Sequence, residues 1–527
     1  MLVVLILGLA LITPRVQAQS EKPAGENAQA ASAAASKAEV EQLRKELASQ
    51  RRAIEQLQTL VEQLTDAKSR APAPTPATGG AHLVNANLTL PVAAAEVEAE
   101  PPAEPYQKPP EKKEGGAAPV SAGWNGEHFF IKSADGQFQI QPYGYVQTDY
   151  RSYLGDGAPP NTFSIRRARF GFQGNYGSHY QFGILIDSTS ATAAAIRDVY
   201  LNVKYNDQIQ FQGGQFKVPF AQEVATAATN LDFVERGLQA LLYPDAASAF
   251  RSPGFMIHGD VSDNRFQYWA GAFNGKGFAV NNTASVPEAI GRVRFYPWRK
   301  NKDSALQGLA VGGSIAYGVT RGLSRELTPN MTMPDASYTY IPQFQANGNV
   351  WRYEGEFTYL KGPLGIRGEY VQALFDRTGV GTLTSGGLGF ANLPNVLFKA
   401  WDASATYLLT KESRPENGTP RVKHPLFGPT ETAGAGGHGW GAWELSFRYT
   451  GIQGKEPGIF FNNVFTPQNV PTFDLHTDQF TFGVNWYWNY WVKFQSNINI
   501  DRLKEPSTIG ATPQNYLVFI QRLQYRF

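Results

Sequence analysis

The chain of 527 residues contains no cysteine. Disulfides, thiolate metal sites, thiol nucleophiles and a lipid-modified N-terminal cysteine are therefore excluded. The formal net charge is only +2, which excludes the strongly basic balance of a nucleic-acid binder. After residue 12, no apolar run reaches the roughly 20 residues that a helical membrane span needs. These absences leave several soluble domains or one large β-barrel.

Aromatic residues and glycine are abundant, in contrast. Aromatics make up 13% of the chain, and there are 52 glycines, although the mean hydropathy is −0.33. A membrane β-barrel alternates lipid-facing and lumen-facing residues, so that its overall hydropathy stays low. An aromatic-rich but polar chain is therefore typical of such a barrel.

The last residues, YLVFIQRLQYRF (516–527), show this alternation. Successive side chains of a strand point to opposite faces. One face carries Tyr525, Leu523, Gln521, Phe519 and Leu517. The other carries Arg526, Gln524, Arg522, Ile520 and Val518. A strand at the edge of a soluble sheet is the alternative, but an apolar face beside a polar one favours a barrel in lipid.

Residues 1–18 are typical of a secretory signal peptide. The apolar run 1–12 is too short to span a bilayer, and Val16 and Ala18 are the small residues that a signal peptidase reads. No Lys or Arg precedes the apolar run, which departs from the usual pattern. A retained anchor is the alternative, and we expect cleavage after Ala18.

A heptad pattern occupies residues 37–66. Apolar residues recur at alternating steps of three and four, with one polar exception: Val40, Leu43, Leu47, Gln50, Ile54, Leu57, Val61 and Leu64. This spacing predicts an α-helical coiled coil that self-associates, with a single amphipathic helix as the alternative. Residues 67–120 are rich in Pro, Ala and Glu, and this composition predicts a semi-rigid linker.

From residue 121 to the end, the pattern predicts an all-β domain, an antiparallel transmembrane barrel of about sixteen strands. The strands are expected near 138–148, 163–174, 179–187, 197–205, 208–217, 254–261, 265–273, 289–296, 307–319, 350–360, 364–374, 398–410, 439–451, 476–488, 491–501 and 515–527. In 443–449, for example, Trp443, Leu445 and Phe447 share one face, and Glu444 and Arg448 share the other.

Connections in this domain alternate in length. Tight turns are expected at 175–178, 206–207, 262–264, 361–363 and 489–490, and long links at 218–253, 274–288, 320–349, 375–397 and 452–475. This alternation is typical of an outer-membrane barrel with both termini periplasmic. The link 411–438 is long where a short turn is expected, which leaves a miscounted strand pair open.

The link 218–253 is the candidate constriction loop, with a helix-like piece at 221–242. We expect it to fold into the lumen, and a surface cap is the alternative. Alternation directs a set of basic residues inward: Arg167, Arg169, Arg292, Arg294, Arg352, Arg367, Arg448, Lys493, Arg522 and Arg526. Fewer acidic residues oppose them: Asp198, Glu354, Glu356, Asp402 and Glu444. The planar guanidinium group of Arg matches the oxygens of phosphate or carboxylate, so the basic residues suit a channel for such anions. The other interpretation of these charged residues is an Arg/Glu network that stiffens the barrel wall.

Catalytic signatures are missing. The chain has no HExxH, P-loop or GxSxG motif, and His424, His438 and His476 lack metal-ligand spacing. We therefore expect no enzyme activity, no cofactor and no metal, with an outer-membrane hydrolase as the remote alternative.

Short stretches in the barrel region resemble the phosphate-selective porin O and P family of Gram-negative outer membranes. They span 138–527 in family order: GYVQTDY (144–150), IRRARFGFQG (165–174), DVYL (198–201), GQFKVPF (214–220), FVERG (233–237), RSPG (251–254), GAFN (271–274), GRVRFYP (291–297), WELSFRY (443–449), GVNWY (483–487) and the terminal IQRLQYRF. The resemblance implies a homotrimer of sixteen-stranded barrels whose Arg- and Lys-lined constriction passes phosphate or polyphosphate.

Residues carried over from the resemblance are Arg166, Arg167, Arg169, Lys217, Arg236 and Arg251. Alternation adds Arg294, Arg448, Lys493 and Arg522 to the candidate pore-lining, anion-binding set. We interpret the chain as a general or anion-preferring porin of the outer membrane, surrounded by lipid, with a periplasmic extension that reaches towards peptidoglycan. A carbohydrate- or nutrient-selective porin and a structural tether to the cell wall are the alternatives.

Overall fold

In a computed structural model, the described residues are 120–154, 160–189, 195–243, 250–275, 282, 286–325, 344–384, 387–427, 439–457, 472–503 and 514–527. All belong to the compact unit Pro109–Phe527. The expected signal peptide 1–18, coiled coil 37–66 and linker 67–120, apart from its last residue, lie outside the described residues.

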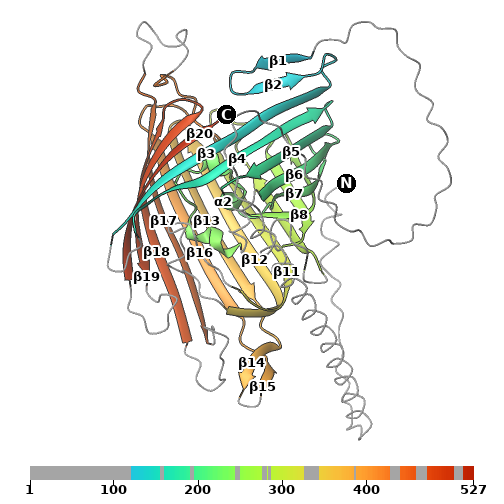
Figure 1. Cartoon of the computed structure of the whole chain (residues 1–527), viewed down its shortest axis with the longest axis vertical. Helices are drawn as coiled ribbons and strands as arrows, with labels where there is room; N and C mark the ends of the chain where they lie inside the picture. Colours follow the sequence, from blue (N-terminus) through green and yellow to red (C-terminus); the bar gives the residue numbers. More distant parts are fainter. Residues whose placement is uncertain are drawn as a thin grey trace, which may run out of the picture. The chain divides into compact units, whose positions relative to one another are not determined.

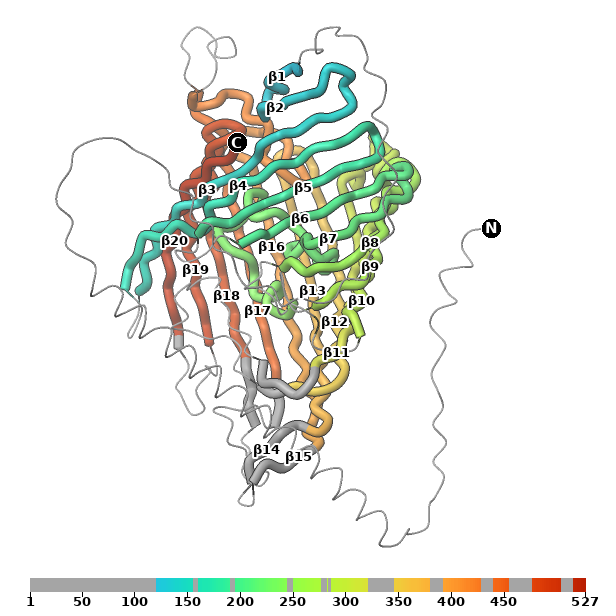
Figure 2. Tube along the Cα trace, turned by 45° about the vertical axis from the view of Figure 1, so that its right-hand side comes forward, coloured from blue at the N-terminus to red at the C-terminus, as the bar shows by residue number. Residues whose placement is uncertain are grey.

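Sixteen strands of the described chain form one closed antiparallel barrel, as predicted (Figures 1 and 2). They are β3 (Phe138–Leu154), β4 (Thr162–Tyr176), β5 (Tyr180–Asp187), β6 (Ala195–Lys204), β7 (Gln210–Lys217), β8 (Arg251–Val261), β9 (Phe266–Phe273), β10 (Glu288–Phe295), β11 (Leu309–Arg325), β12 (Phe344–Lys361), β13 (Leu364–Phe375), β16 (Val396–Leu408), β17 (Ala442–Pro457), β18 (Thr472–Tyr487), β19 (Val492–Leu503) and β20 (Gln514–Arg526). Each strand pairs with its neighbours in chain order.

The last strand closes the barrel against the first. β20 pairs antiparallel with β3, with Arg522 opposite Asp149 and Gln524 opposite Gln147. Arg522 is wholly buried and Leu523 is 45% exposed, so the two predicted faces of this strand are confirmed. Closure leaves no free edge in the ring, which removes the unpaired backbone groups that lipid cannot satisfy.

Inward and outward faces follow the alternation elsewhere. In β17, Glu444 and Arg448 are buried, whereas Leu445 and Phe447 are exposed on the outer surface. A charged interior and an apolar exterior are the reverse of a soluble protein, and they suit a barrel that stands in lipid around a polar lumen.

Two hairpins were not predicted. β1 (Ser121–Trp124) and β2 (Phe129–Lys132) form one that extends the sheet, because β2 pairs with the start of β3. β14 (Val380–Thr384) and β15 (Gly387–Ala391) form the other, within the link after β13. Figure 1 shows the first hairpin at the end of the barrel where β20 finishes and the second at the opposite end.

The connections agree with the expected short and long ends. Ser262, Asp263 and Asn264 turn β8 into β9 with φ of 55°, 55° and 60°, the left-handed region in which Asp and Asn are enriched. The long link after β16 contains no strand within 409–427 and 439–441, so the open question of a miscounted strand pair is settled against one there.

Regular helix is scarce in the described residues. The expected helix-like piece 221–242 is wrong as a single element: the structure has α2 (Gln222–Ala225), η1 (Ala228–Asn230) and η2 (Leu238–Leu242), joined by irregular backbone. No described helix is both long and apolar enough to cross a membrane.

Candidate functional site

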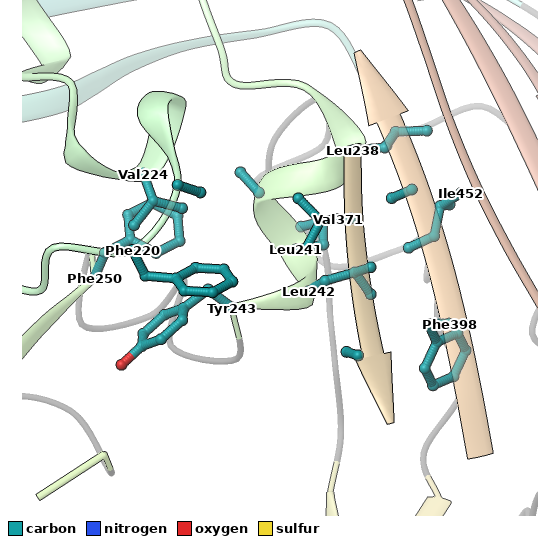
Figure 3. Close-up of a cluster of buried hydrophobic side chains, with 14 of the residues drawn as sticks. Phe220, Val224, Leu238, Leu241, Leu242, Tyr243, Phe250, Val371, Phe398 and Ile452 are labelled. Carbon is teal, nitrogen blue, oxygen red and sulfur yellow. The ribbon is translucent and has the colours of Figure 1, made fainter. Parts of the chain in front are cut away.

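The described part of the link between β7 and β8, residues 218–243 and Phe250, lies inside the barrel, as predicted (Figure 2). We call it the inner loop. Phe220 and Leu242 are wholly buried. Figure 3 shows them in the cluster that also contains Val371 and Phe398 from the wall. Burial of apolar side chains therefore draws the inner loop into the lumen, since each one removed from water contributes about 1.5–3 kcal/mol.

Polar side chains of the wall bind the backbone of the inner loop. Asn497 Oδ1 accepts from the Val234 N–H at 2.7 Å, and Thr450 Oγ1 accepts from the Leu238 N–H at 3.0 Å. The Asn485 amide donates to the Asp232 carbonyl at 2.8 Å. The wall thus supplies hydrogen-bond partners for backbone groups that would otherwise bond to each other within a helix. This explains why the loop need not be helical.

Several of the predicted lumen bases donate to carbonyls of the same loop. Lys493 Nζ lies 3.2 Å from the Thr229 and Leu231 oxygens, and Arg448 Nη1 lies 2.9 Å from the Glu235 oxygen. Another basic group, Lys217, donates to the Thr226 carbonyl. These side chains hold the inner loop in place as well as carrying positive charge.

Glu235, on the inner loop, lies among four arginines. Arg151 Nη2 and Arg166 Nε each lie 2.8 Å from Glu235 Oε1, Arg522 Nη2 lies 2.9 Å from it, and Arg167 Nη2 lies 3.4 Å from Oε2. Burial by itself would raise the pKa of the Glu235 carboxyl, but these guanidinium charges outweigh it and hold the pKa well below its usual range.

A β-bulge explains why the consecutive residues Arg166 and Arg167 both reach Glu235. The β3–β4 register shifts between Gln147 and Thr148, so that Arg166 has no partner residue in β3. A bulge re-aims a side chain that strict alternation would send outward. With Asp149, which pairs with Arg151 and Arg522, this group contains four cations and two carboxylates.

An open cavity of about 630 Å³ lies at the end of the barrel near the C-terminus. We call it the vestibule. Its charged lining residues are Asp198, Lys217, Arg251, Arg292 and Arg526, and aromatic side chains such as Tyr143, Tyr200 and Trp269 line it too. Arg251 binds Asp198 through two hydrogen bonds of 2.9 Å, and Arg292 pairs with Glu356. Lys217 and Arg526 are therefore the lining residues that give an excess of positive charge.

Acidic side chains gather on a different part of the wall. Glu356 of β12 is directly opposite Glu369 of β13, which is directly opposite Asp402 of β16. Glu354 lies two residues from Glu356 on the same inward face and is also buried. The lumen therefore has an acidic row beneath the inner loop and a basic group around Glu235.

The link after β16 also enters the lumen. Arg414 forms ion pairs with Asp232 of the inner loop and with Glu444 of β17, and Glu416 pairs with Arg294. Arg414 is 6% exposed, although sequence reasoning treated this link as an irregularity in the strand count.

The structure places all ten predicted site residues along the lumen wall or the inner loop. Arg166, Arg167 and Arg522 come together at Glu235, whereas Arg169 pairs with Asp187 at 2.8 Å. Arg236 donates to the carbonyls of Glu223 and Thr226. Sequence reasoning missed Glu235, Arg414, Asp149 and Arg151. The last two continue the inward alternation of β3, which was expected to end at 148.

A closed barrel that is apolar outside, charged inside and narrowed by an infolded loop defines an outer-membrane channel of the porin class. More particularly, the chain belongs to the phosphate-selective porin O and P family, whose model matches residues 140–527. No curated protein matches the chain in sequence.

Solved structures similar to this chain include OmpT of Vibrio cholerae in its trimer form, at 14% identity over 74% of this chain and 99% of that one, with a TM-score of 0.45. The outer membrane channel DcaP of Acinetobacter baumannii is similar at 11% identity over 75% and 99% of the two chains, with a TM-score of 0.44. An anion-selective porin from Comamonas acidovorans is similar at 11% identity over 74% and 100%, with a TM-score of 0.43.

Proposed function

We propose that this channel passes small hydrophilic solutes by passive diffusion and prefers anions, with phosphate or polyphosphate as the solute class. The observation that carries this proposal is the charge of the vestibule, where four basic residues face one acidic residue. A cleft lined by charge of one sign raises the local concentration of the opposite ion. Arg251 and Arg292 already bind Asp198 and Glu356, so the forked guanidinium group of Arg526 is the one that suits the oxygens of phosphate.

The group around Glu235 supports the same preference. Four arginines outnumber Glu235 and Asp149, and the Arg166 side chain is still 27% exposed. An anion that reaches this depth meets a guanidinium with unused donors, whereas a cation meets net repulsion. The infolded loop narrows the path here, so we assign the selectivity to the stretch between the vestibule and Arg166.

Planar-bilayer recording of the full chain tests the preference. In a KCl gradient we expect a reversal potential that favours chloride, and a chloride current that phosphate reduces. Arg526→Gln lowers the anion preference, and the matched control Lys302→Gln, in an exposed turn outside the vestibule, leaves it unchanged. A reversal potential that favours potassium, or the same shift in both variants, contradicts the proposal.

A carbohydrate-selective channel is the second candidate, because Tyr143, Tyr200 and Trp269 offer rings to the vestibule. Aromatic faces stack on sugar rings, as they do in other amphipathic sites. Block of the current by oligosaccharides but not by phosphate favours this candidate. A protein that inserts and carries no current favours the tether to the cell wall.

Assembly is part of the same proposal. We infer a homotrimer in the lipid of the outer membrane, with a periplasmic N-terminal extension that contacts peptidoglycan. The heptads of residues 37–66 and the family resemblance support it, and the similar Vibrio cholerae OmpT is described in a trimer form.

A further inference from the structure

The acidic row of the lumen wall brings like charges together. Glu356 and Glu369 are directly opposite each other on neighbouring strands, where like charges destabilise a sheet. All three of Glu354, Glu356 and Glu369 are buried at 6–7% exposure. A buried carboxylate group of this kind needs a positive partner or must lose its charge.

Within the described residues, the positive partners are too few. Glu356 receives two contacts from Arg292 Nη2, at 2.7 and 2.8 Å, and Arg294 Nε lies 3.4 Å from Glu356 Oε1. Glu354 and Glu369 have no ion pair there, and each relies on neutral donors: Ser314 Oγ lies 2.8 Å from Glu354, and Gln239 Nε2 lies 3.0 Å from Glu369. Three carboxylates and two guanidinium groups leave a net charge of −1, and both guanidinium groups lie at Glu356.

One carboxylate oxygen lacks even a neutral donor. Among the described residues, Glu354 Oε1 has no hydrogen-bond partner, and the residue is only 7% exposed. Buried polar atoms without a partner are rare, and they often mark the place of an ion or water. This atom belongs to the side chain that completes the carboxylate group with Glu356 and Glu369.

We propose that Glu354, Glu356 and Glu369 bind one divalent cation, and that the cation is Ca²⁺. Each residue offers an oxygen, and the three oxygens lie within 4.8 Å of one another. One Ca²⁺ can contact all three oxygens at its usual distances of about 2.3–2.6 Å, and its flexible coordination suits a group of carboxylates. Mg²⁺ demands a near-ideal octahedron and usually keeps several of its waters, and Zn²⁺ prefers nitrogen and sulfur ligands.

The site also touches the inner loop. Glu369 Oε1 accepts from the Glu223 N–H at 3.1 Å, and Gln239 of the same loop donates to the other oxygen. Ser314, which donates to Glu354, accepts from the Ala221 N–H at 3.1 Å. A cation bound here therefore fixes the carboxylates that hold both halves of the loop, and Ca²⁺ stabilises the narrowed state of the channel.

Calcium titration of the full chain, refolded in detergent and freed of metal by a chelator, tests the site. We expect saturable binding of one Ca²⁺ per chain, weaker binding of Mg²⁺, and a higher unfolding midpoint with Ca²⁺. Glu354→Gln and Glu369→Gln each weaken the affinity by about tenfold or more. Asp303→Asn, which removes a carboxylate from an exposed turn, leaves the affinity unchanged.

Two results overturn the proposal. One is wild-type protein that shows no saturable Ca²⁺ binding and no rise in its unfolding midpoint, a measurement that does not depend on whether either variant folds. The other is an infrared spectrum in which these carboxyls are protonated at neutral pH in the presence of Ca²⁺, because the row would then lose its charge by sharing protons.

Discussion

Arg414 and Asp232 reach each other inside the barrel from links that leave it at opposite ends. Arg414 belongs to the link after β16 and Asp232 to the inner loop, and Glu444 of β17 binds the same guanidinium. Two infolded segments are therefore joined by one buried ion pair, and the width of the channel depends on both.

Replacement of Arg414 tests this junction. Arg414→Met removes the ion pair of Glu444 and leaves Asp232 with only Arg367, whose Nε lies 3.6 Å away. Breaking a buried ion pair lowers the free energy of unfolding by about 3–5 kcal/mol. We expect a lower unfolding midpoint and a larger single-channel conductance, because the two segments separate. Arg421→Met changes an exposed residue of the same link and is the control. Equal conductance in both variants would show that the ion pair does not set the width.

Glu235 gives the channel a dependence on pH. Its folded-state pKa is lowered, so its contribution to stability is present above the unfolded pKa of about 4.3 and is lost as pH falls towards the folded pKa. We expect the urea midpoint of the wild type to fall as the pH drops below about 4.3. Glu235→Gln removes this part of the pH dependence. The same substitution leaves the four arginines with one carboxylate, Asp149, so we expect the anion preference of the variant channel to rise. A wild-type pH profile retained by the variant contradicts this assignment.

The apolar cluster of the inner loop predicts a cavity effect. Leu242→Ala opens a cavity where a wholly buried side chain packs against the wall. Such changes lower the free energy of unfolding by about 2–5 kcal/mol. We expect noisier channel currents, because the loop loosens while the strand pairing persists. Leu445→Ala removes a side chain of the same size from the lipid-facing surface and serves as the control. Quiet currents in the Leu242 variant would mean that polar contacts alone fix the loop.

The N-terminal heptads predict that residues 37–66 stabilise the oligomer. Deletion of these residues should lower the temperature at which the proposed trimer dissociates in detergent and should weaken co-sedimentation with peptidoglycan. A control deletion of equal length within the linker 67–120 should keep the trimer intact. Unchanged dissociation and sedimentation after removal of the heptads would refute the role of the coiled coil.

Alternation predicted most of the barrel from sequence, because a strand with one face in lipid and one in water repeats every two residues. The closure of β20 on β3 and the inward set on β17 follow directly from that period. The hairpins 121–132 and 380–391 were missed because they are short and lie outside the lipid-spanning ring, where no such contrast is imposed.

The candidate site was predictable only in part. Inward-facing bases such as Arg448 and Arg522 could be identified, but their partners on the inner loop could not, since contacts between distant segments leave no local period. Arg166 was carried over from the family motif, and the bulge that turns it inward has no sequence signal in β4. The inner loop was predicted to fold inward, and its irregular backbone follows from wall groups such as Asn497 that satisfy it.

The inner loop spans the lumen between several strands. It binds Ser314 of β11, Thr450 of β17 and Asn497 of β19, which lie on different parts of the ring. Any flattening of the ring changes the distances between these strands, and it must therefore stretch or compress the hydrogen bonds that join them to the inner loop. The inner loop is therefore an internal brace that resists flattening of the ring.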